Sequence, residues 1–177
     1  MPWRRTGVSG TAENQEGALP RQHAMERFLS SAVNRIDAKG RLSVPAHFRA
    51  VLAKRGYSDL YALRALDIPA LDVGGPDLLD RYEGRIAAED PFGQTADDMS
   101  FFCHGDGAFL KIDQDGRITM TDFLRAHTGI SDEAAFVGRG TFFQIWEPGR
   151  LAEYGAQVRA RLLAMKQGAM TGSRGTE

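Results

Sequence analysis

Two aspartate–arginine pairs are the residues of this chain best suited to recognising another molecule. Asp37 precedes Arg41 by four positions, and Asp113 precedes Arg117 by the same spacing. An aspartate can cap a turn by accepting backbone N–H bonds, and an arginine can bind a phosphate or a guanine edge through two parallel hydrogen bonds. Two interpretations are open. In the first, each aspartate pairs with its own arginine, and such an exposed ion pair contributes about 0–1 kcal/mol to stability. In the second, the arginines are held at hairpin tips to contact nucleic acid. Composition alone favours the first.

Both pairs belong to an internal repeat. Residues 33–50 (VNRIDAKGRLSVPAHFRA) align with residues 109–126 (FLKIDQDGRITMTDFLRA) when the sequence is shifted along itself by 76 positions. The residues of the first copy that recur unchanged are Ile36, Asp37, Gly40, Arg41, Arg49 and Ala50. The apolar positions also match, since Val44 falls on Met120 and Phe48 on Leu124. A repeat at a fixed period indicates two copies of one supersecondary unit.

The beginning of each unit has the pattern of a β-hairpin. Residues 33–36 are short and rich in β-branched side chains, and residues 42–44 alternate between apolar and polar, as a half-buried strand does. Between them, Asp37 can accept backbone N–H bonds and Gly40 can adopt a positive φ. The sequence therefore predicts a strand, a tight turn and a second strand in each copy.

A short helix is predicted after each hairpin. Pro45 favours the start of the first helix, where a missing N–H costs least, and Gly56 is placed to end it. In the second copy Thr121 replaces the proline and can serve as N-cap, and Gly129 is placed to end the helix. Phe48 lies on the apolar face of the first helix. A hairpin and a two-turn helix cannot bury their own apolar face, but two copies can bury theirs against each other.

Two strands and a longer helix are expected after each unit. The expected strands are residues 60–63, 70–73, 134–137 and 142–146, and the expected helices start at Pro76 and Pro148. Residues 89–100 are predicted to be a loop or a short link. The pattern as a whole predicts an α+β fold that is mainly β, with one joint core.

The expected division of the chain follows the repeat. Residues 25–100 form the first repeat with its strands and helix, and residues 101–167 form the second with the C-terminal helix. Residues 1–24 have no apolar run and are expected to be disordered. Because the pattern begins just after Met25, that residue is a candidate for the true start. Residues 168–177 are expected to be a flexible polar tail.

Several function classes have little support in the sequence. The single cysteine, Cys103, cannot form an intrachain disulfide, which fits a reducing cytoplasm, and no run of about 18 apolar residues could span a membrane. The histidines lack zinc-ligand spacing, and Lys111 occupies the first ligand position of the only calcium-like loop. We expect no metal, no cofactor, no small-molecule ligand and no catalytic residue. A small enzyme with a pocket lined by Asp97, Asp98 and His104 is the weakest alternative.

The charges are unevenly distributed along the chain. The formal net charge is −1, which by itself does not indicate a nucleic-acid partner. Cations outnumber carboxylates between residues 25 and 55, whereas carboxylates outnumber cations between residues 66 and 106. This distribution permits a basic face on a nearly neutral protein. Two ordinary solvated surfaces are the alternative explanation.

The duplicated hairpins resemble the swapped-hairpin motif of AbrB and SpoVT type DNA-binding domains. The resemblance is carried by Asp37-Ala38-Lys39-Gly40-Arg41-Leu42-Ser43-Val44-Pro45 and by Asp113-Gln114-Asp115-Gly116-Arg117. Two such motifs in a chain of this size resemble the MraZ family of transcriptional regulators in particular, over about residues 25–161. The resemblance implies a swapped-hairpin β-barrel formed jointly by both repeats, with helices packed outside it.

The resemblance also implies a function and a set of contacts. The protein would be a cytoplasmic, nucleoid-associated repressor that assembles as a ring-shaped homo-oligomer. It would bind short direct repeats of double-stranded DNA upstream of the division and cell-wall gene cluster, including its own gene. The expected DNA contacts are Arg35, Lys39, Arg41, Lys111 and Arg117. The expected turn residues are Asp37, Gly40, Asp113 and Gly116.

The second hairpin departs from the family motif in two places. Asp115 stands where the first copy has Lys39 and would repel phosphate, and Thr121 stands where the motif usually has proline. We therefore expect the first hairpin to contact DNA more than the second. A protein-interaction module that uses the same barrel is the competing hypothesis.

Overall fold

The computed structural model describes the backbone of residues 26–172 and the side chains of residues 26–168. The predicted disorder of residues 1–24 therefore lies outside the described residues, as does the end of the predicted tail. The elements of the first half are β1 (Ser31–Arg35), β2 (Arg41–Ser43), α1 (Ala46–Lys54), β3 (Asp59–Arg64), β4 (Ala70–Gly74), α2 (Pro76–Ile86) and α3 (Gln94–Gly105). The elements of the second half are β5 (Gly107–Lys111), β6 (Arg117–Thr119), α4 (Asp122–Thr128), β7 (Glu133–Gly138), β8 (Phe143–Trp146) and α5 (Pro148–Gly172).

The strands form two antiparallel sheets whose order reflects the repeat. The larger sheet has the order β1-β7-β8-β4-β3-β5, and β2 pairs with β6 in the smaller one. If each strand is replaced by its equivalent in the other repeat, the order becomes β5-β3-β4-β8-β7-β1. This is the same order read from the opposite edge of the sheet. The two halves of the chain are therefore related by an approximate two-fold axis that passes between β4 and β8.

The two repeats exchange strands. The first hairpin strand of each copy joins a strand of the other copy, because β1 pairs with β7 and β5 pairs with β3. In the smaller sheet Leu42 lies opposite Ile118, which are equivalent residues of the two copies. The Val44 N–H donates to the Gly116 carbonyl at 3.0 Å, and the Met120 N–H donates to the Gly40 carbonyl at 2.9 Å. These two symmetric hydrogen bonds fix the register of β2 against β6.

One core is shared by both copies, as the sequence predicts. Leu42 and Phe48 from the first unit and Ile118 and Leu124 from the second unit are fully or almost fully buried in the same cluster. Four phenylalanines lie at its centre: Phe28, Phe48, Phe136 and Phe143. The ring centroids of Phe28 and Phe48 are 5.4 Å apart in an edge-to-face arrangement, which favours aromatic pairs beyond their buried area.

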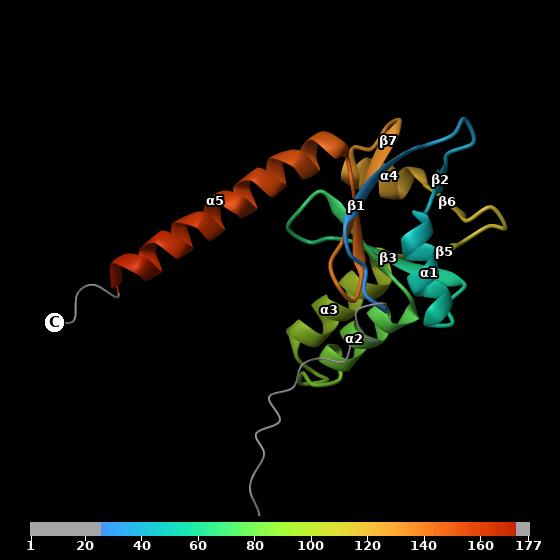
Figure 1. The fold of residues 1–177 in the computed structure, drawn as a ribbon. Coiled ribbons are helices and arrows are strands. Elements are labelled where there is room, and N and C mark those ends of the chain that lie inside the picture. The colour runs from blue at the N-terminus through green and yellow to red at the C-terminus, as the bar shows by residue number, and fades with distance from the viewer. Residues whose placement is uncertain (1–25, 173–177) are drawn as a thin grey trace, which may run out of the picture.

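The fold class is α+β with antiparallel sheets and helices α1–α5, as the sequence predicts, but the expectation of a mainly β fold is wrong, because more of residues 26–172 lie in helices than in strands. Residues 26–172 do not form a closed barrel, since β1 and β5 remain the two edges of the larger sheet. Figure 1 shows the hairpin loops projecting from one side of the molecule and α5 projecting from the opposite side. Among the described helices, none combines the length and hydropathy that crossing a membrane requires.

The predicted loop over residues 89–100 is wrong for most of its length. The helix α3 begins at Gln94 and packs beside α2. Its buried residues Ala96 and Cys103 are seven positions apart, and the partly buried Phe102 contacts the cluster that includes Tyr82 of α2. The acidic residues between them obscure this apolar face in the sequence, and packing against α2 stabilises it. The helix α5 extends to Gly172, past the predicted end at residue 167.

The glycine positions that end the short helices agree with prediction. Gly56 follows α1 with a φ of +75°, and Gly129 follows α4 with a φ of +73°. Thr121 occupies the N-cap position of α4, but its side chain makes no capping hydrogen bond. Pro45 occupies the corresponding position before α1.

Replacing Phe48 with alanine is expected to destabilise the protein strongly. The side chain is fully buried among three other phenylalanine rings, so its loss should lower the free energy of unfolding by about 3–5 kcal/mol. The measurement is denaturant unfolding at matched protein concentrations. Phe109, whose side chain is 61% exposed, supplies the control, and its replacement with alanine should cost about 1 kcal/mol or less. Equal losses for the two variants would contradict the shared core.

Candidate nucleic-acid interface

The first hairpin tip is organised by the carboxylate of Asp37. Its Oδ1 accepts the backbone N–H groups of Lys39 and Arg41, each at 2.9 Å. Its Oδ2 accepts the Nε of Arg41 at 2.7 Å and lies 2.7 Å from Nη2 of the same guanidinium. The Asp37 N–H donates to the Arg41 carbonyl at 2.9 Å, and Gly40 closes the turn with a φ of +74°. One carboxylate thus holds both the turn and the arginine.

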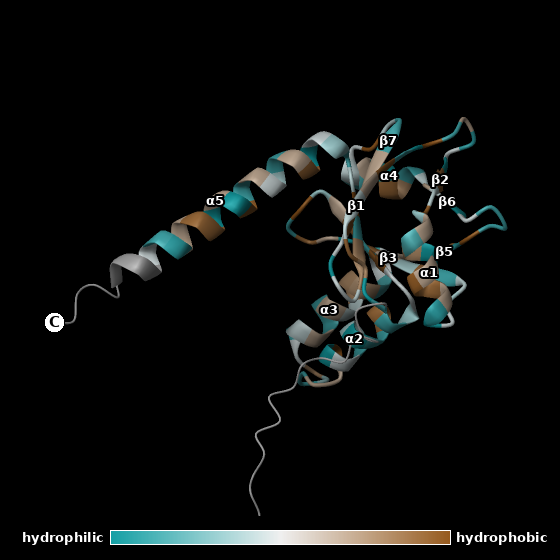
Figure 2. Ribbon diagram, in the orientation of Figure 1, coloured by the Kyte–Doolittle hydropathy of each residue, from teal (hydrophilic) through white to brown (hydrophobic). Residues whose placement is uncertain are grey.

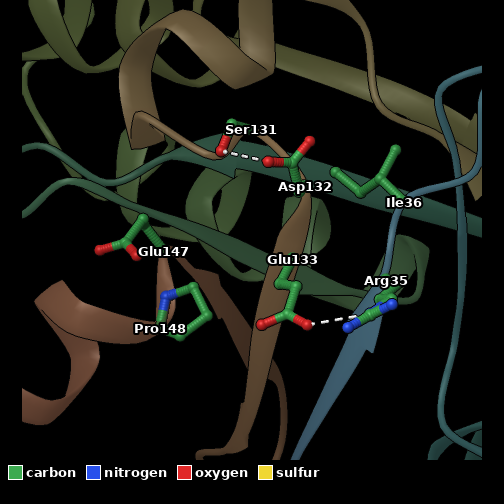
Figure 3. Close-up of a pocket in the computed structure, with 7 residues that line it drawn as sticks. All are labelled: Arg35, Ile36, Ser131, Asp132, Glu133, Glu147 and Pro148. Atoms are coloured by element: carbon green, nitrogen blue, oxygen red, sulfur yellow. Dashed lines mark hydrogen bonds and ion pairs between the residues drawn. The ribbon is translucent and has the colours of Figure 1, made fainter.

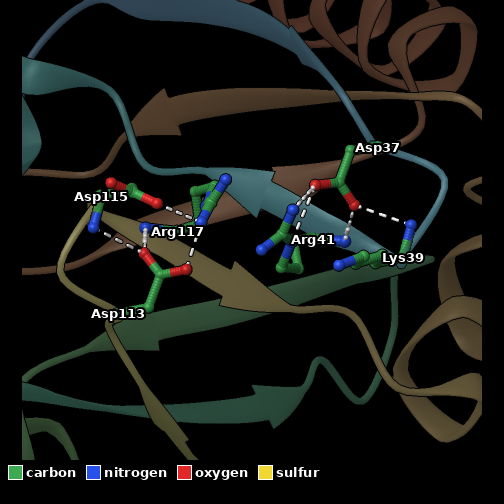
Figure 4. Close-up of polar contacts among 6 residues, drawn as sticks. All are labelled: Asp37, Lys39, Arg41, Asp113, Asp115 and Arg117. Carbon is green, nitrogen blue, oxygen red and sulfur yellow. Dashed lines mark hydrogen bonds and ion pairs between the residues drawn. The ribbon is translucent and has the colours of Figure 1, made fainter.

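The second tip repeats this arrangement. Asp113 accepts the backbone N–H groups of Asp115 and Arg117 through Oδ1, and the Nε of Arg117 through Oδ2, all at 2.9 Å. Gly116 has a φ of +76°. The tip differs from the first in one respect, because Nη2 of Arg117 also pairs with the carboxylate of Asp115 (Figure 4).

Both tips are held in ionised form by their hydrogen bonds. The Arg41 side chain, followed by the Arg41 backbone N–H, lowers the pKa of Asp37 from 3.8 to about 2. The backbone N–H of Arg117 is the largest cause of a lowered pKa at Asp113, and the Arg117 side chain adds to it. The pKa of Arg117 is raised, chiefly by its hydrogen bond to Asp113. Each tip therefore carries a fixed ion pair at neutral pH.

The pairing leaves part of each guanidinium available for another partner. In Arg41 both Nε and Nη2 face Asp37, whereas in Arg117 Nε faces Asp113 and Nη2 pairs with Asp115, so Nη1 is the remaining side of each planar group. Asp37 and Arg41 have the pairing of the first interpretation drawn from the sequence. This geometry is also compatible with the second, because a guanidinium has five donors and the carboxylate uses only one edge.

The arginines of the two tips share one face of the smaller sheet. In β2 and β6 the central residues Leu42 and Ile118 are buried, and the residues on either side alternate toward solvent. Arg41 pairs with Thr119 in the register, and Ser43 pairs with Arg117. The two arginines therefore lie diagonally across a short sheet, with the two tips at its opposite ends (Figure 4).

The other three predicted contacts are placed differently. Lys39 lies exposed in the first turn, beside Arg41. Arg35 lies at the end of β1, where its Nε donates to Glu133 at 3.1 Å, and Lys111 lies at the end of β5 opposite Asp59. The structure thus brings Lys39, Arg41 and Arg117 to the tips and the small sheet. Arg35 and Lys111 are at the strand ends that lead into the turns.

The pocket beside Arg35 does not have the character of an anion site. It measures about 460 Å³ and is lined by Arg35, Ile36, Ser131, Asp132, Glu133, Glu147 and Pro148. Figure 3 shows Arg35 directed at Glu133 across the pocket. Three carboxylates against one guanidinium make its lining acidic, so it does not extend the cationic surface of the tips.

Arg49 is a residue of this region that sequence reasoning did not assign to the site. It belongs to α1, yet its side chain covers Gly116 so closely that an added Cβ there would overlap the guanidinium. Its counterpart in the second copy, Arg125, instead donates to the carbonyl of Ser131. The sequence signal that could have identified Arg49 was the presence of an arginine at this position in both copies. Its contact with Gly116 could not be predicted, because the two residues are far apart in the chain.

The residues of the enzyme alternative are not gathered into one pocket. Asp98 accepts from Gln94 at 2.8 Å, and His104 bonds the Ser100 carbonyl at 2.8 Å and lies 3.3 Å from Glu83. Only Asp97 of the three lines the pocket between α2 and α3. Within residues 26–168 no three acidic, histidine or cysteine side chains form a group that could hold a metal ion.

Comparison with known proteins identifies relatives over most of the chain. A protein of Rhizobium johnstonii named Transcriptional regulator MraZ is 54% identical over 144 residues, which is 81% of this chain and 99% of the relative. Proteins with the same name from Rhizobium meliloti and Xanthobacter autotrophicus are 53% and 41% identical, covering 76% and 81% of this chain and 92% and 91% of their own lengths. No protein-family model matches the chain.

The pKa of Asp37 should respond to the loss of its arginine. In the folded protein it is expected near 2, below the 3.8 of an unperturbed aspartate. The ionised carboxylate therefore stabilises the fold fully above pH 3.8, and this contribution is lost as the pH falls through about 2. A carboxyl NMR titration of Arg41→Gln should show a raised pKa that still lies below 3.8, since the backbone N–H bonds remain. Arg85→Gln serves as the control, and an unchanged Asp37 titration in Arg41→Gln would contradict the pairing.

Proposed function

Because the chain belongs to the MraZ family of transcriptional regulators, we propose that it binds DNA sequence-specifically and regulates transcription, mainly as a repressor. Its targets are short direct repeats upstream of the division and cell-wall gene cluster, including its own gene, so it acts at the nucleoid. The observation that carries the proposal is the pair of exposed tips with ordered arginines on one face of the small sheet.

The geometry of the tips suits a DNA duplex. Guanidinium groups that are already oriented by a carboxylate lose little side-chain freedom on binding, which reduces the cost of forming a contact. The Nη1 side of Arg41 can donate to a phosphate oxygen or to an acceptor on a guanine edge. Lys39, two residues before Arg41 in the same turn, supplies a second cation for the phosphate backbone.

The first tip is the main contact. It has two cations, Lys39 and Arg41, and one carboxylate, Asp37. The second tip has two carboxylates, and even with Arg49 beside Gly116 its cations only balance them. Since the phosphate backbone repels carboxylates, the first tip is the more favourable partner.

The function depends on assembly as well as on the tip. In this proposal the small sheet spans the two edges of the larger one, so that both sheets together approach a swapped-hairpin barrel. The exchanged strands and the bridge between Ile36 and Leu42, which links β1 to β2, support it. Copies of the chain form a ring in which several tips face the repeated DNA boxes together. A single tip binds weakly, and simultaneous engagement raises the avidity by about 10²–10⁴.

Arg41→Ala should abolish the mobility shift of DNA from immediately upstream of the gene. Each tip should lose about 1–3 kcal/mol of binding free energy, and these losses add over all the tips that bind together. Folding and assembly should be unchanged, as judged by circular dichroism and light scattering, because the side chain is at the surface of the turn. Arg85→Ala, on α2, should bind as the original protein does. Normal binding by Arg41→Ala would remove the first tip from the interface.

The affinity for this DNA should fall steeply with salt. Each phosphate contact releases counterions and contributes about −0.9 to the slope of log K against log salt concentration. Replacing Lys39 with alanine should make the slope less negative by about 0.9 for each first tip that touches the duplex. Fluorescence anisotropy over a salt series provides the measurement. A flat salt response would instead favour a protein partner for the tips.

A further inference from the structure

The loop after α2 and the helix α3 expose two large apolar side chains. Phe92, in the loop between α2 and α3, is 97% exposed, and Phe101 of α3 is 76% exposed. The ribbon of α2 and α3 carries both hydrophilic and hydrophobic residues (Figure 2). Exposed apolar patches on soluble proteins mark surfaces that contact a partner. This surface therefore has the character of a contact that residues 26–168 do not themselves complete.

A groove lies between α2 and α3 beside the exposed loop. It measures about 380 Å³, and three apolar residues and two carboxylates contribute to its lining: Ile86, Pro91, Ala96, Glu89 and Asp97. Asp97 and Phe101 are four positions apart on α3, so they lie on the same side of this helix. From residue 87 to residue 105 the chain contains four carboxylates and neither lysine nor arginine. The groove thus combines apolar surface with negative charge.

Such a groove fits a segment that combines a large apolar side chain with cations. The chain contains one among residues 1–25, which precede the first described residue, because Trp3 is followed directly by Arg4 and Arg5. Tryptophan and arginine are among the side chains that most often dominate the affinity of a protein contact. The two arginines match the two carboxylates of the groove in number and are opposite in charge.

The start of the described chain is held close to this groove. The Nε of Arg55 donates to the Glu26 carbonyl at 3.1 Å, and Glu26 lines one pocket together with Arg81 of α2. Ile86, in the lining of the groove, is five residues beyond Arg81, which is a rise of about 7.5 Å along the helix. Arg5 is 21 positions before Glu26. An unstructured chain of this length spans about 25 Å on average, so the groove is within its reach.

We propose that residues 3–5 dock in the α2–α3 groove of the same chain. The indole of Trp3 packs against Phe92, and the two guanidinium groups pair with Glu89 and Asp97. The covalent tether makes the contact intramolecular, with an effective concentration on the order of millimolar. The inference goes beyond the proposed function, because it involves neither hairpin tip.

DNA is the less favourable partner for residues 3–5. The chain leaves Glu26 beside α2, and α2 and α3 lie at the end of the molecule away from the first hairpin tip (Figure 1). The arginines therefore start close to the carboxylates of the groove. A duplex bound at the first tip lies farther away.

Trp3 reports the contact directly. The chain has two tryptophans, and the other one, Trp146, is buried in the core. The emission of the original chain minus that of Trp3→Phe therefore gives the emission of Trp3. It should be blue-shifted, and its quenching constant with acrylamide should be several-fold lower than in the same chain in denaturant.

Charge reversal within the full chain tests the pairing. One variant carries Arg4→Glu and Arg5→Glu, and another carries Glu89→Lys and Asp97→Lys. Each should raise the acrylamide quenching of Trp3 several-fold, and a chain with all four substitutions should regain the protection, because its charges are complementary again. Circular dichroism establishes that the variants are folded. Glu153→Lys, at an exposed position of α5 outside the groove, should leave the quenching unchanged.

Two exposed phenylalanines provide a matched pair for the apolar part of the contact. Phe92→Ala should raise the quenching of Trp3 several-fold, because the indole loses the ring against which it packs. Phe109→Ala, on the edge strand β5, removes an exposed ring outside the groove and should leave the quenching unchanged.

The inference is overturned if Trp3 is as accessible in the original chain as in denaturant, if the chain with four substitutions fails to regain protection, or if both phenylalanine variants behave alike. Protection that appears only with upstream DNA would overturn it in favour of a DNA contact. Protection restored in a co-expressed mixture of the two double variants would overturn it in favour of a contact between copies. Binding of upstream DNA, lost in Arg41→Ala, tests the proposed function separately.

Discussion

A strand of three residues with one buried side chain cannot form a stable sheet by itself, and β2 and β6 therefore depend on each other. Their pairing places Leu42 against Ile118 and brings the apolar faces of both units into one core. It also fixes the position of each turn, because the carbonyls of Gly40 and Gly116 accept N–H bonds from the opposite copy. Each hairpin tip is thus anchored by a residue of the other copy, Met120 for Gly40 and Val44 for Gly116. The fixed conformation of the tips therefore depends on the whole fold rather than on a local turn.

The same anchoring explains how an exposed arginine can have a defined position. A long side chain at a surface usually samples many rotamers, and fixing it costs free energy. Here Asp37 is immobilised by two backbone N–H bonds before it accepts from Arg41, so the guanidinium is bound to a rigid acceptor. The aspartate lowers the net charge of the tip but gives the arginine its direction. The turn therefore loses net positive charge but gains a fixed orientation of Arg41, and Lys39 makes the net charge of the turn positive again.

Much of this architecture could be predicted from the repeat. The shift of 76 positions identifies the hairpins, the turns and the glycines that end the short helices, because local turn chemistry and apolar alternation are properties of neighbouring residues. The partner of each strand could not be predicted, since equivalent strands carry equivalent patterns. The helix α3 was missed because Asp97 and Asp98 interrupt an apolar face that only α2 completes. The contact of Arg49 with Gly116 is likewise set by packing between the copies.

The approximate two-fold axis relates tips that are chemically unequal, and this gives a single chain a polarity. A dimer with exact two-fold symmetry presents identical ends and matches a palindromic site, which reads the same on both strands. In this chain one end offers Lys39 where the other offers Asp115, so in the proposed DNA complex reversing the molecule would place a carboxylate where a cation had been. Under the proposed function, such a chain would distinguish the two directions of a duplex. Successive copies that point the same way would then match boxes repeated in one direction rather than inverted ones.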